Sequence, residues 1–349
     1  MTFAEIIGQD EIKNHLQSAL QQKKISHAYI INGEAESGKM MMAEAFAAAL
    51  LCEQHGIESC GECKSCHQLL THNHPDVRYV SAPKVMEVRE QIVGDMVVKP
   101  YSSEYKIYIV DHAEEMDAAA QNALLKTIEE PPAYGVILLL VNNDQRLLQT
   151  IRSRCVTLNI KPLRNEQIKT RLMQTYQLPD YEAEVLTAFA QGNLGRAVKL
   201  TESEAFSEAR KDVIRISSKI LNTNDAEVIT LAKEYQSKYP VRIKKTADKE
   251  DGTKGASEGD ASNEPITLEE FLDLLVVWYR DVLLYKASQK ANQIIFSDAL
   301  AQIRTQAAKL DYESLEWIIK SIDKTKRQIH SNVSGEIALD SLLLSIKEK

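Results

Sequence analysis

The sequence lacks any apolar run long enough to cross a membrane. Unbroken apolar runs such as Val136 to Val141 are far shorter than the ~20 residues that a membrane-spanning helix needs. The N-terminus also lacks the charged-then-apolar pattern of a signal peptide. We therefore expect no membrane contact and a cytoplasmic location.

The sequence also lacks an excess of basic residues. Its 42 Lys and Arg against 50 Asp and Glu give a formal net charge of −8 at pH 7, whereas proteins that bind nucleic acid nonspecifically usually carry a basic excess. This argues against a free-standing nonspecific DNA binder, and we expect any DNA contact to be local or shared with partners. The 349 residues, 44% of them hydrophobic, suffice for two or three domains.

Short apolar segments alternate with helical stretches in the first half of the sequence. This alternation is typical of an α/β fold in which helices cover a parallel sheet. The candidate strands are residues 28–32, 76–80, 106–111, 135–141 and 155–160.

The first candidate strand leads into a phosphate-binding loop. Gly33–Lys39 has the spacing G-x-x-x-x-G-K, in which backbone N–H groups and the lysine bind phosphate oxygens. The Ser or Thr whose hydroxyl normally binds Mg²⁺ is replaced by Met40, and a thioether is a poor ligand for this hard cation. We expect a nucleotide site or, alternatively, a vestigial loop that is now only a turn.

A second position differs from that of an active P-loop ATPase, at the end of the candidate strand 106–111. Asp111 stands where a carboxylate usually steadies Mg²⁺, but His112 occupies the position of the glutamate that polarises the attacking water. We interpret Glu114 and Glu115 as solvated carboxylates at the start of the next helix. The two losses together predict reduced or absent ATP hydrolysis.

A cluster of cysteines follows the helix that the phosphate-binding loop opens. Two C-x-x-C spacings and one further cysteine can converge on a tetrahedral metal ion, and the pattern predicts a structural zinc site. An iron–sulfur cluster and unligated thiols are the alternatives. The predicted ligands are Cys52, Cys60, Cys63 and Cys66, with His55 and His67 as possible substitutes.

The string NALLKTIEEPP at Asn122–Pro132 resembles the helix that follows the Walker B strand in the AAA+ clamp-loader family of bacterial DNA polymerase III. Ile7-Gly8-Gln9, His27-Ala28-Tyr29 and Ser153-Arg154-Cys155 fall in the matching order, and the cysteines lie just after the P-loop helix as in this family. The resemblance covers about residues 1–210 by motifs, and the remainder mainly by length and helical character.

The resemblance implies roles for several residues. Arg154 would be an arginine finger that acts in trans on the γ-phosphate held by a neighbouring subunit; the alternative is a surface arginine in a salt bridge. Asn142 would sense the γ-phosphate, although it can also be a turn residue, and Arg196 would face the nucleotide of its own subunit. The nucleotide-binding set, functional or vestigial, is Gly33, Gly38, Lys39, Asp111, Asn142 and Arg196.

The resemblance also implies a division into domains. The expected parts are an AAA+ core at 1–161 with the zinc module at 52–66, a helical lid at 162–205, and a C-terminal helical oligomerisation collar at 206–349. The polar segment 246–265 contains too little apolar surface to order itself and is expected to be a disordered insert. Leu268, Phe271, Leu272, Leu275 and Trp278 then resume at helical spacing.

The function that follows by analogy is that of a non-motor clamp-loader subunit, which binds zinc, binds ATP without hydrolysing it or not at all, and has no ATPase activity of its own. Its partners would be the gamma/tau and delta subunits in a hetero-pentameric ring and, through that complex, the sliding clamp and primed DNA. Two other interpretations remain open, an ATP-hydrolysing AAA+ motor subunit and a zinc-dependent DNA-binding module.

Overall fold

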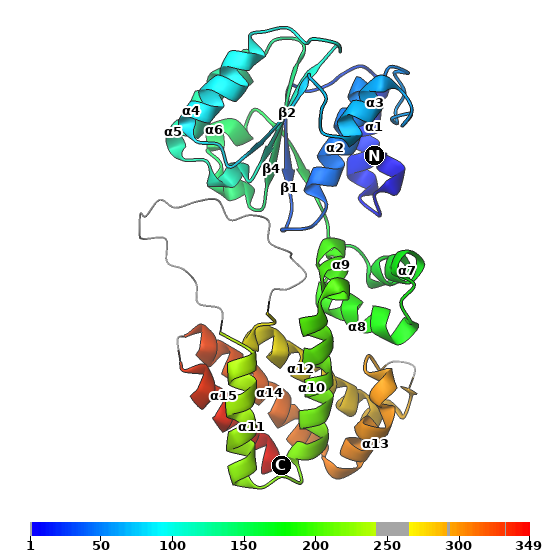
Figure 1. Cartoon of the computed structure of the whole chain (residues 1–349), viewed down its shortest axis with the longest axis vertical. Helices are drawn as coiled ribbons and strands as arrows, with labels where there is room; N and C mark the ends of the chain where they lie inside the picture. The colour runs from blue at the N-terminus through cyan, green and yellow to red at the C-terminus, as the bar shows by residue number, and fades with distance from the viewer. Residues whose placement is uncertain (1, 242–264, 292–293, 332) are drawn as a thin grey trace. The chain divides into compact units, whose positions relative to one another are not determined.

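The computed structural model describes residues 2–241, 265–291, 294–331 and 333–349 (Figure 1). The chain divides into two compact units, of which the first comprises Met1–Arg171 and Ala190–Arg196, and the second Leu172–Phe189 and Ala197–Lys349. Apart from Pro265, the polar segment 246–265 that was predicted to be disordered lies outside the described residues.

The first unit is built on a five-stranded sheet in which every strand pair is parallel. The strand order is β2-β3-β4-β1-β5, and the prediction of an α/β fold is confirmed. Two of the strands begin one residue later than expected. The strands are β1 (Ala28–Asn32), β2 (Val77–Ser81), β3 (Lys106–Asp111), β4 (Gly135–Val141) and β5 (Val156–Asn159).

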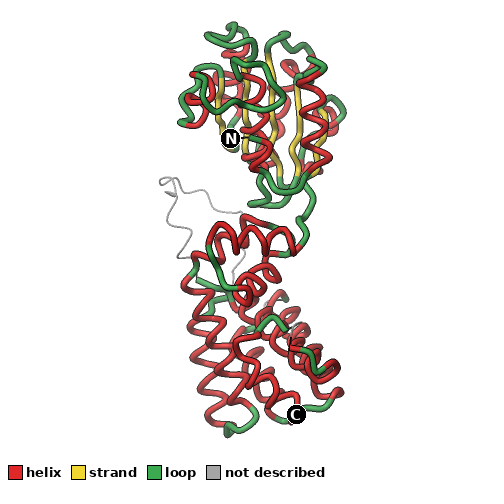
Figure 2. The backbone as a smooth tube through the Cα atoms, turned by 90° about the vertical axis from the view of Figure 1, so that its right-hand side faces the viewer, coloured by secondary structure: helices red, strands yellow, loops and turns green. Residues whose placement is uncertain are grey.

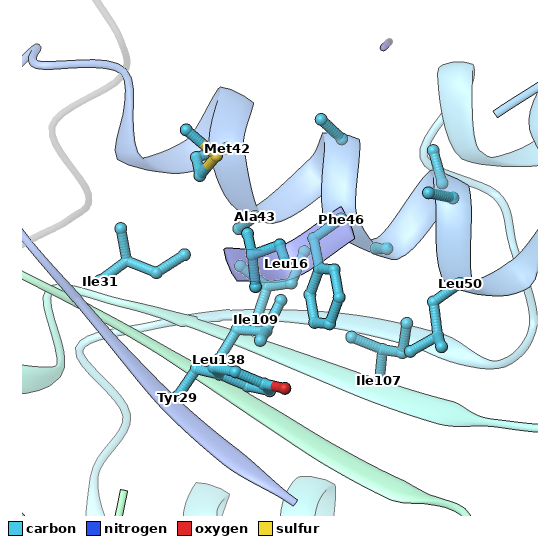
Figure 3. Packing of buried hydrophobic residues seen from close by; sticks show 14 of the residues in the cluster. Leu16, Tyr29, Ile31, Met42, Ala43, Phe46, Leu50, Ile107, Ile109 and Leu138 are labelled. Atoms are coloured by element: carbon cyan, nitrogen blue, oxygen red, sulfur yellow. The ribbon is translucent and has the colours of Figure 1, made fainter. Parts of the chain in front are cut away.

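Helices cover both faces of this sheet (Figure 2). One face packs against α1 and α2, where Leu16, Phe46 and Tyr29 are buried in a common apolar cluster (Figure 3). The other face packs against α5 and α6 through Leu124 and Ile151. The helices of this unit are α1 (Asp10–Gln21), α2 (Lys39–Leu51), α3 (Lys64–Leu70), α4 (Val85–Glu87), which continues as a π-helix at Val88–Gly94, α5 (Ala118–Glu129) and α6 (Gln149–Arg152).

The helix α5 has a clear sequence signal at each end. The carboxylate of Asp117 accepts a hydrogen bond from the N–H of Ala120 at 2.7 Å and so satisfies one of the unpaired donors of the first turn. Pro131 and Pro132 follow the helix and cannot continue it. The helix therefore ends at Glu129, which becomes important for the candidate site.

The second unit contains helices and no strand among its described residues. The residues predicted to resume at helical spacing, Leu268, Phe271, Leu272, Leu275 and Trp278, are all buried in α12. None of the helices in the described ranges is both long and apolar enough to span a membrane. The division between the units falls within α7, α8 and α9. The helices after the sheet are α7 (Asn165–Tyr176), α8 (Asp180–Ala190), α9 (Leu194–Glu202), α10 (Glu204–Ile220), α11 (Asp225–Lys238), α12 (Leu268–Ser288), α13 (Leu300–Lys309), α14 (Tyr312–His330) and α15 (Gly335–Lys347).

Candidate functional site

The phosphate-binding loop connects β1 to α2 at the carboxyl edge of the sheet. Gly38 precedes the first residue of α2 and has φ = 89°, a left-handed conformation that glycine adopts without a steric penalty. Gly33 is also confined, because a Cβ atom there would lie 2.8 Å from the hydroxyl oxygen of Ser37. The path of the loop therefore favours glycine at position 38, and a side chain at position 33 would require Ser37 to move.

Lys39 is buried and bonded within the protein. Its Nζ donates to the carbonyl oxygens of Gly33 at 2.8 Å and Glu34 at 2.5 Å, and to Oδ1 of Asn142 at 2.8 Å. Burial lowers the pKa of Lys39, and the nearby Asp111 and Glu114 carboxylates oppose this effect. Because an ammonium group has three N–H donors, a phosphate would have to displace at least one of these contacts.

Met40 lies where a P-loop ATPase has its Mg²⁺-binding hydroxyl. Its side chain is half-buried and packs against the apolar cluster between α2 and the sheet. The residue at this position thus contributes to core packing, and its thioether does not suit a hard cation.

Asp111 and His112 lie on the turn after β3. The carboxylate of Asp111 accepts from the backbone N–H of His112 at 2.9 Å. The imidazole lies 3.8 Å from the Asp111 carboxylate and 3.9 Å from that of Glu115. His112 adopts a positive φ of 49°, which turns the chain sharply at the site where a catalytic glutamate would stand.

The interpretation of Glu114 as a solvated carboxylate is wrong. Its side chain is buried, and its Oε1 accepts a hydrogen bond from the backbone N–H of Asn142 at 3.0 Å. Residues Ala113–Glu115 form a separate 3₁₀ turn that does not continue into α5, so Glu114 points inward. Glu115 is exposed, as expected. The signal available in the sequence was a carboxylate three residues beyond the end of a buried strand.

Asn142 connects Lys39 of the phosphate-binding loop with Glu114, which follows β3. Its side chain accepts from Lys39 and its backbone N–H donates to Glu114. Because β3, β4 and β1 are neighbours in a parallel sheet, their carboxyl ends meet at one edge and bring Lys39, Asp111 and Asn142 together. Lys39 and Asn142, whose side chains are bonded to each other, are 103 positions apart in the sequence.

A small cavity lies beside the loop. Its volume is about 240 Å³, below the ~300–1,000 Å³ usual for ligand pockets. Asn193 donates to the carbonyl oxygen of Ala35 at 2.6 Å, and a Cβ atom on Gly195 would lie 2.3 Å from the carbonyl oxygen of Glu36. Residues 193–195 thus hold the tip of the loop. The cavity is lined by Gln9, Asn32, Gly33, Glu34, Ser37, Asn142, Asn159, Ile160, Lys161, Pro162, Leu163, Gln191, Gly192, Asn193 and Leu194.

Arg196 directly follows Gly195, which packs against the phosphate-binding loop. Its backbone N–H donates to Oδ1 of Asn193 at 3.2 Å, and the residue is half-buried. The segment that carries Arg196 therefore reaches the loop through the side chain of Asn193 and the backbone at Gly195.

The four predicted metal ligands converge. The Sγ atoms of Cys52, Cys60, Cys63 and Cys66 all lie within 4.8 Å of one another, and neither His55 nor His67 belongs to this group. Cys52 directly follows α2, and Cys63 caps the N-terminus of α3. Four thiolates in this arrangement can hold one tetrahedral ion such as zinc.

Backbone donors favour the thiolate form in this cluster. The N–H groups of Cys60, Cys63 and Cys66 donate to the sulfur atoms of Cys52, Cys60 and Cys63 at 3.3, 3.3 and 3.4 Å. Backbone N–H groups of Glu62 and Cys63 lower the pKa of Cys60 to about 7, whereas burial raises the pKa of Cys66 to about 12. Because a metal binds the thiolate and not the thiol, the local backbone suits a metal site.

A buried serine–histidine pair next to the cysteine cluster is structural. Ser65 Oγ lies 2.9 Å from Nε2 of His74, and the N–H of Asp76 donates to Nδ1 of the same ring at 3.1 Å. Burial lowers the pKa of His74, so the neutral ring carries its proton on Nε2 and donates it to Ser65. His74 therefore cannot remove a proton from Ser65.

Arg154 lies on the surface just after α6. Its Nη1 donates to the carbonyl oxygen of Thr150 at 3.0 Å, and its Nη2 lies 3.0 Å from Oε1 of Glu129. The side chain is 41% exposed. The neighbouring Cys155 is half-buried against the apolar cluster around α5, and burial raises its pKa to about 12.

Comparison with known proteins relates this chain to components of DNA polymerase III. Residues 8–164 match the family described as "DNA polymerase III, delta subunit", and residues 261–348 match "DNA polymerase III, delta subunit, C terminal". The chain is 28% identical to the DNA polymerase III subunit delta' of Bacillus subtilis, over 97% of this chain and 96% of that protein.

One further sequence relative and one solved structure are similar to this chain. The chain is 29% identical to the tau subunit of Bacillus subtilis, over 97% of this chain but only 60% of the longer relative. Among solved structures, it is similar to the DNA clamp loader delta protein of Bacillus subtilis, with 13% identity, 97% of this chain and 100% of that chain covered, and a TM-score of 0.34.

Proposed function

The chain belongs to the family of DNA polymerase III clamp-loader subunits, and from this premise we propose that it is a non-motor, delta-prime-type subunit that completes a neighbour's ATP site. In this proposal Arg154 reaches across a subunit interface and stabilises the negative charge that develops on the transferred phosphoryl group. The neighbour supplies the nucleotide and Mg²⁺, and this chain supplies the guanidinium of Arg154.

The observation that carries the proposal is the exposed guanidinium of Arg154. Arg154 contacts the carbonyl oxygen of Thr150 and the carboxylate of Glu129 within this chain, yet its side chain is 41% exposed on the surface of the first unit and is accessible to a phosphate of another subunit. Its planar fork of donors matches phosphate oxygens.

The chain's own nucleotide site supports a role other than that of a motor. Met40 and His112 replace two groups that ATP hydrolysis requires, and Lys39 donates to three acceptors of the protein itself. In our proposal ATP either binds here without being hydrolysed or does not bind. Zinc holds the cysteine module together and takes no part in the chemistry.

The proposed assembly is a hetero-pentameric ring with gamma/tau and delta subunits, which loads a sliding clamp on primed DNA. Residues 1–161 would provide the AAA+ core, residues 162–205 the lid, and residues 206–349 the oligomerisation collar. The relatives named above, which include both delta' and tau subunits, support partners of this kind.

The test is ATP turnover by a reconstituted clamp loader that contains either this chain or its Arg154→Ala variant. Loss of an arginine finger can cost about 10³–10⁵ in rate at the site it serves, so turnover stimulated by clamp and DNA should fall to the level of the remaining sites. Equal assembly of the two complexes must be verified. Unchanged turnover and clamp loading would reject the trans role.

One observation favours the motor alternative. The buried carboxylate of Glu114 contributes to the electrostatics of Lys39, and its Oε2 atom has no hydrogen-bond partner within the described part of the chain. In this alternative Glu114 serves as the catalytic carboxylate whose usual position His112 occupies. ATP hydrolysis by the purified chain, abolished by Glu114→Gln, would establish this alternative; our proposal expects no turnover by the chain alone.

A further inference from the structure

The guanidinium of Arg154 is held from two sides. Nη1 donates to the carbonyl oxygen of Thr150 in α6, and Nη2 lies 3.0 Å from Oε1 of Glu129, the last residue of α5. Nη1 also lies 3.4 Å from the hydroxyl oxygen of Ser153. Two separate elements therefore fix one side chain that has no role in the core.

Glu129 occupies an unfavourable place for a carboxylate. The C-terminal end of a helix carries a partial negative charge, which favours cations and disfavours acids. Yet α5 ends with Glu129, and Glu130 follows it. Helix stability does not explain a carboxylate at this position, whereas its contact with Arg154 does.

The pair is too exposed to act as a stability device. The two side chains are 41% and 45% exposed, and exposed ion pairs contribute little to stability. The same weakness means that a triphosphate, with several negative charges, can compete for the guanidinium. Glu129 thus orients Arg154 without preventing it from contacting an anion.

We propose that Glu129 is a positioning residue that orients the guanidinium of Arg154 toward the phosphate of the neighbouring subunit. The inference rests on the proposed trans role of Arg154. An oriented cation has less conformational freedom to lose when the transition state forms. Loss of Glu129 should therefore lower kcat at the neighbour's site and leave the KM for ATP nearly unchanged.

The experiment compares four forms of this chain in the reconstituted loader: wild type, Arg154→Ala, Glu129→Ala and the double variant. The Arg154-dependent turnover is the difference between wild type and Arg154→Ala. We expect Glu129→Ala to lower the Arg154-dependent turnover about tenfold, because a small misplacement of a catalytic group can lower the rate by up to about 100-fold. The double variant should match Arg154→Ala.

Glu130→Ala is the matched control. It removes the same charge from the same helix end, and within the described ranges Glu130 makes no ion pair with Arg154. It should keep the Arg154-dependent turnover. The melting temperature and the assembly of each variant are measured as well, so that a loss of turnover through misfolding or failed assembly is recognised.

The outcomes separate the two proposals. If Arg154→Ala leaves turnover unchanged, the trans role itself fails, and the positioning role fails with it. If Arg154→Ala lowers turnover but Glu129→Ala does not, only the positioning role is rejected. A rise in turnover with Glu129→Ala would also reject it, because the carboxylate would then be restraining Arg154.

Discussion

At the scale of single residues, Lys39 is a part of the folded loop as much as a candidate phosphate ligand. It is 8% exposed, and its ammonium donates to Gly33, Glu34 and Asn142. Lys39→Met would leave these three acceptors without their donor, and hydrogen bonds to charged groups contribute about 1.5–3 kcal/mol each in favourable cases.

We therefore expect Lys39→Met to lower the free energy of unfolding by roughly 1–3 kcal/mol in the absence of any nucleotide. Denaturant unfolding of the purified chain measures this change. Lys24→Met, which alters an exposed lysine, is the control and should change little. Equal stability of the Lys39 variant and the wild type would mean that the internal contacts contribute nothing.

Asp281 in α12 makes the second unit sensitive to pH. The carboxylate is fully buried and accepts from the N–H of Phe296 at 2.8 Å. Burial raises its pKa to about 6, so folding favours the protonated form. The stability that this proton contributes is fully present below about pH 4 and is lost as the pH rises through about 6.

Asp281→Asn keeps an oxygen acceptor for Phe296 and removes the charge. A pKa raised from 3.8 to about 6 corresponds to a gain of up to ~3 kcal/mol at pH values above both. We expect the variant to be more stable than the wild type near pH 8 and the difference to shrink toward pH 4. Thermal unfolding across this range tests it, with the exposed Asp323→Asn as control. A difference that does not depend on pH would contradict the assignment to Asp281.

At the scale of the elements, α2 connects the phosphate-binding loop with the cysteine cluster. It begins at Lys39 in the phosphate-binding loop and is followed directly by Cys52 of the cysteine cluster. A bound metal would therefore anchor the C-terminal end of the helix whose N-terminal end carries the loop.

Metal content tests this arrangement. We expect about one zinc per chain, loss of most of it in Cys63→Ser, and a lower melting temperature for that variant, since structural zinc contributes directly to folding. Cys155→Ser removes a thiol that lies outside the cluster and should retain the metal. Full zinc occupancy in Cys63→Ser, or iron in place of zinc, would overturn the prediction.

The elements also explain which parts of the site could be predicted. The loop Gly33–Lys39 and the spacing of the cysteines are local patterns, and the sequence reveals them directly. The contact between Asn142 and Lys39 depends on β4 pairing with β1, and the burial of Glu114 depends on a 3₁₀ turn that ends before α5. Such facts follow from strand order and from how the chain leaves a strand, and neither has a short-range signature.

At the scale of the whole molecule, the two compact units divide the segment predicted to form the lid. Residues 190–196 belong to the first unit, because Asn193 and Gly195 contact the phosphate-binding loop at Ala35 and Glu36. The helical periodicity on either side of this segment carries no information about that contact.

The net charge of the whole chain leads to the last prediction. With eight more acidic than basic residues, the chain has no electrostatic excess with which to release counterions from DNA, which is the main source of nonspecific affinity. We expect the purified chain to show no salt-dependent binding to primed DNA in fluorescence anisotropy, even at low salt. The assembled loader should bind the same DNA, because the other subunits would supply the basic surface. Salt-sensitive binding by the chain alone that disappears in Cys63→Ser would contradict this expectation and would favour a zinc-dependent DNA-binding module.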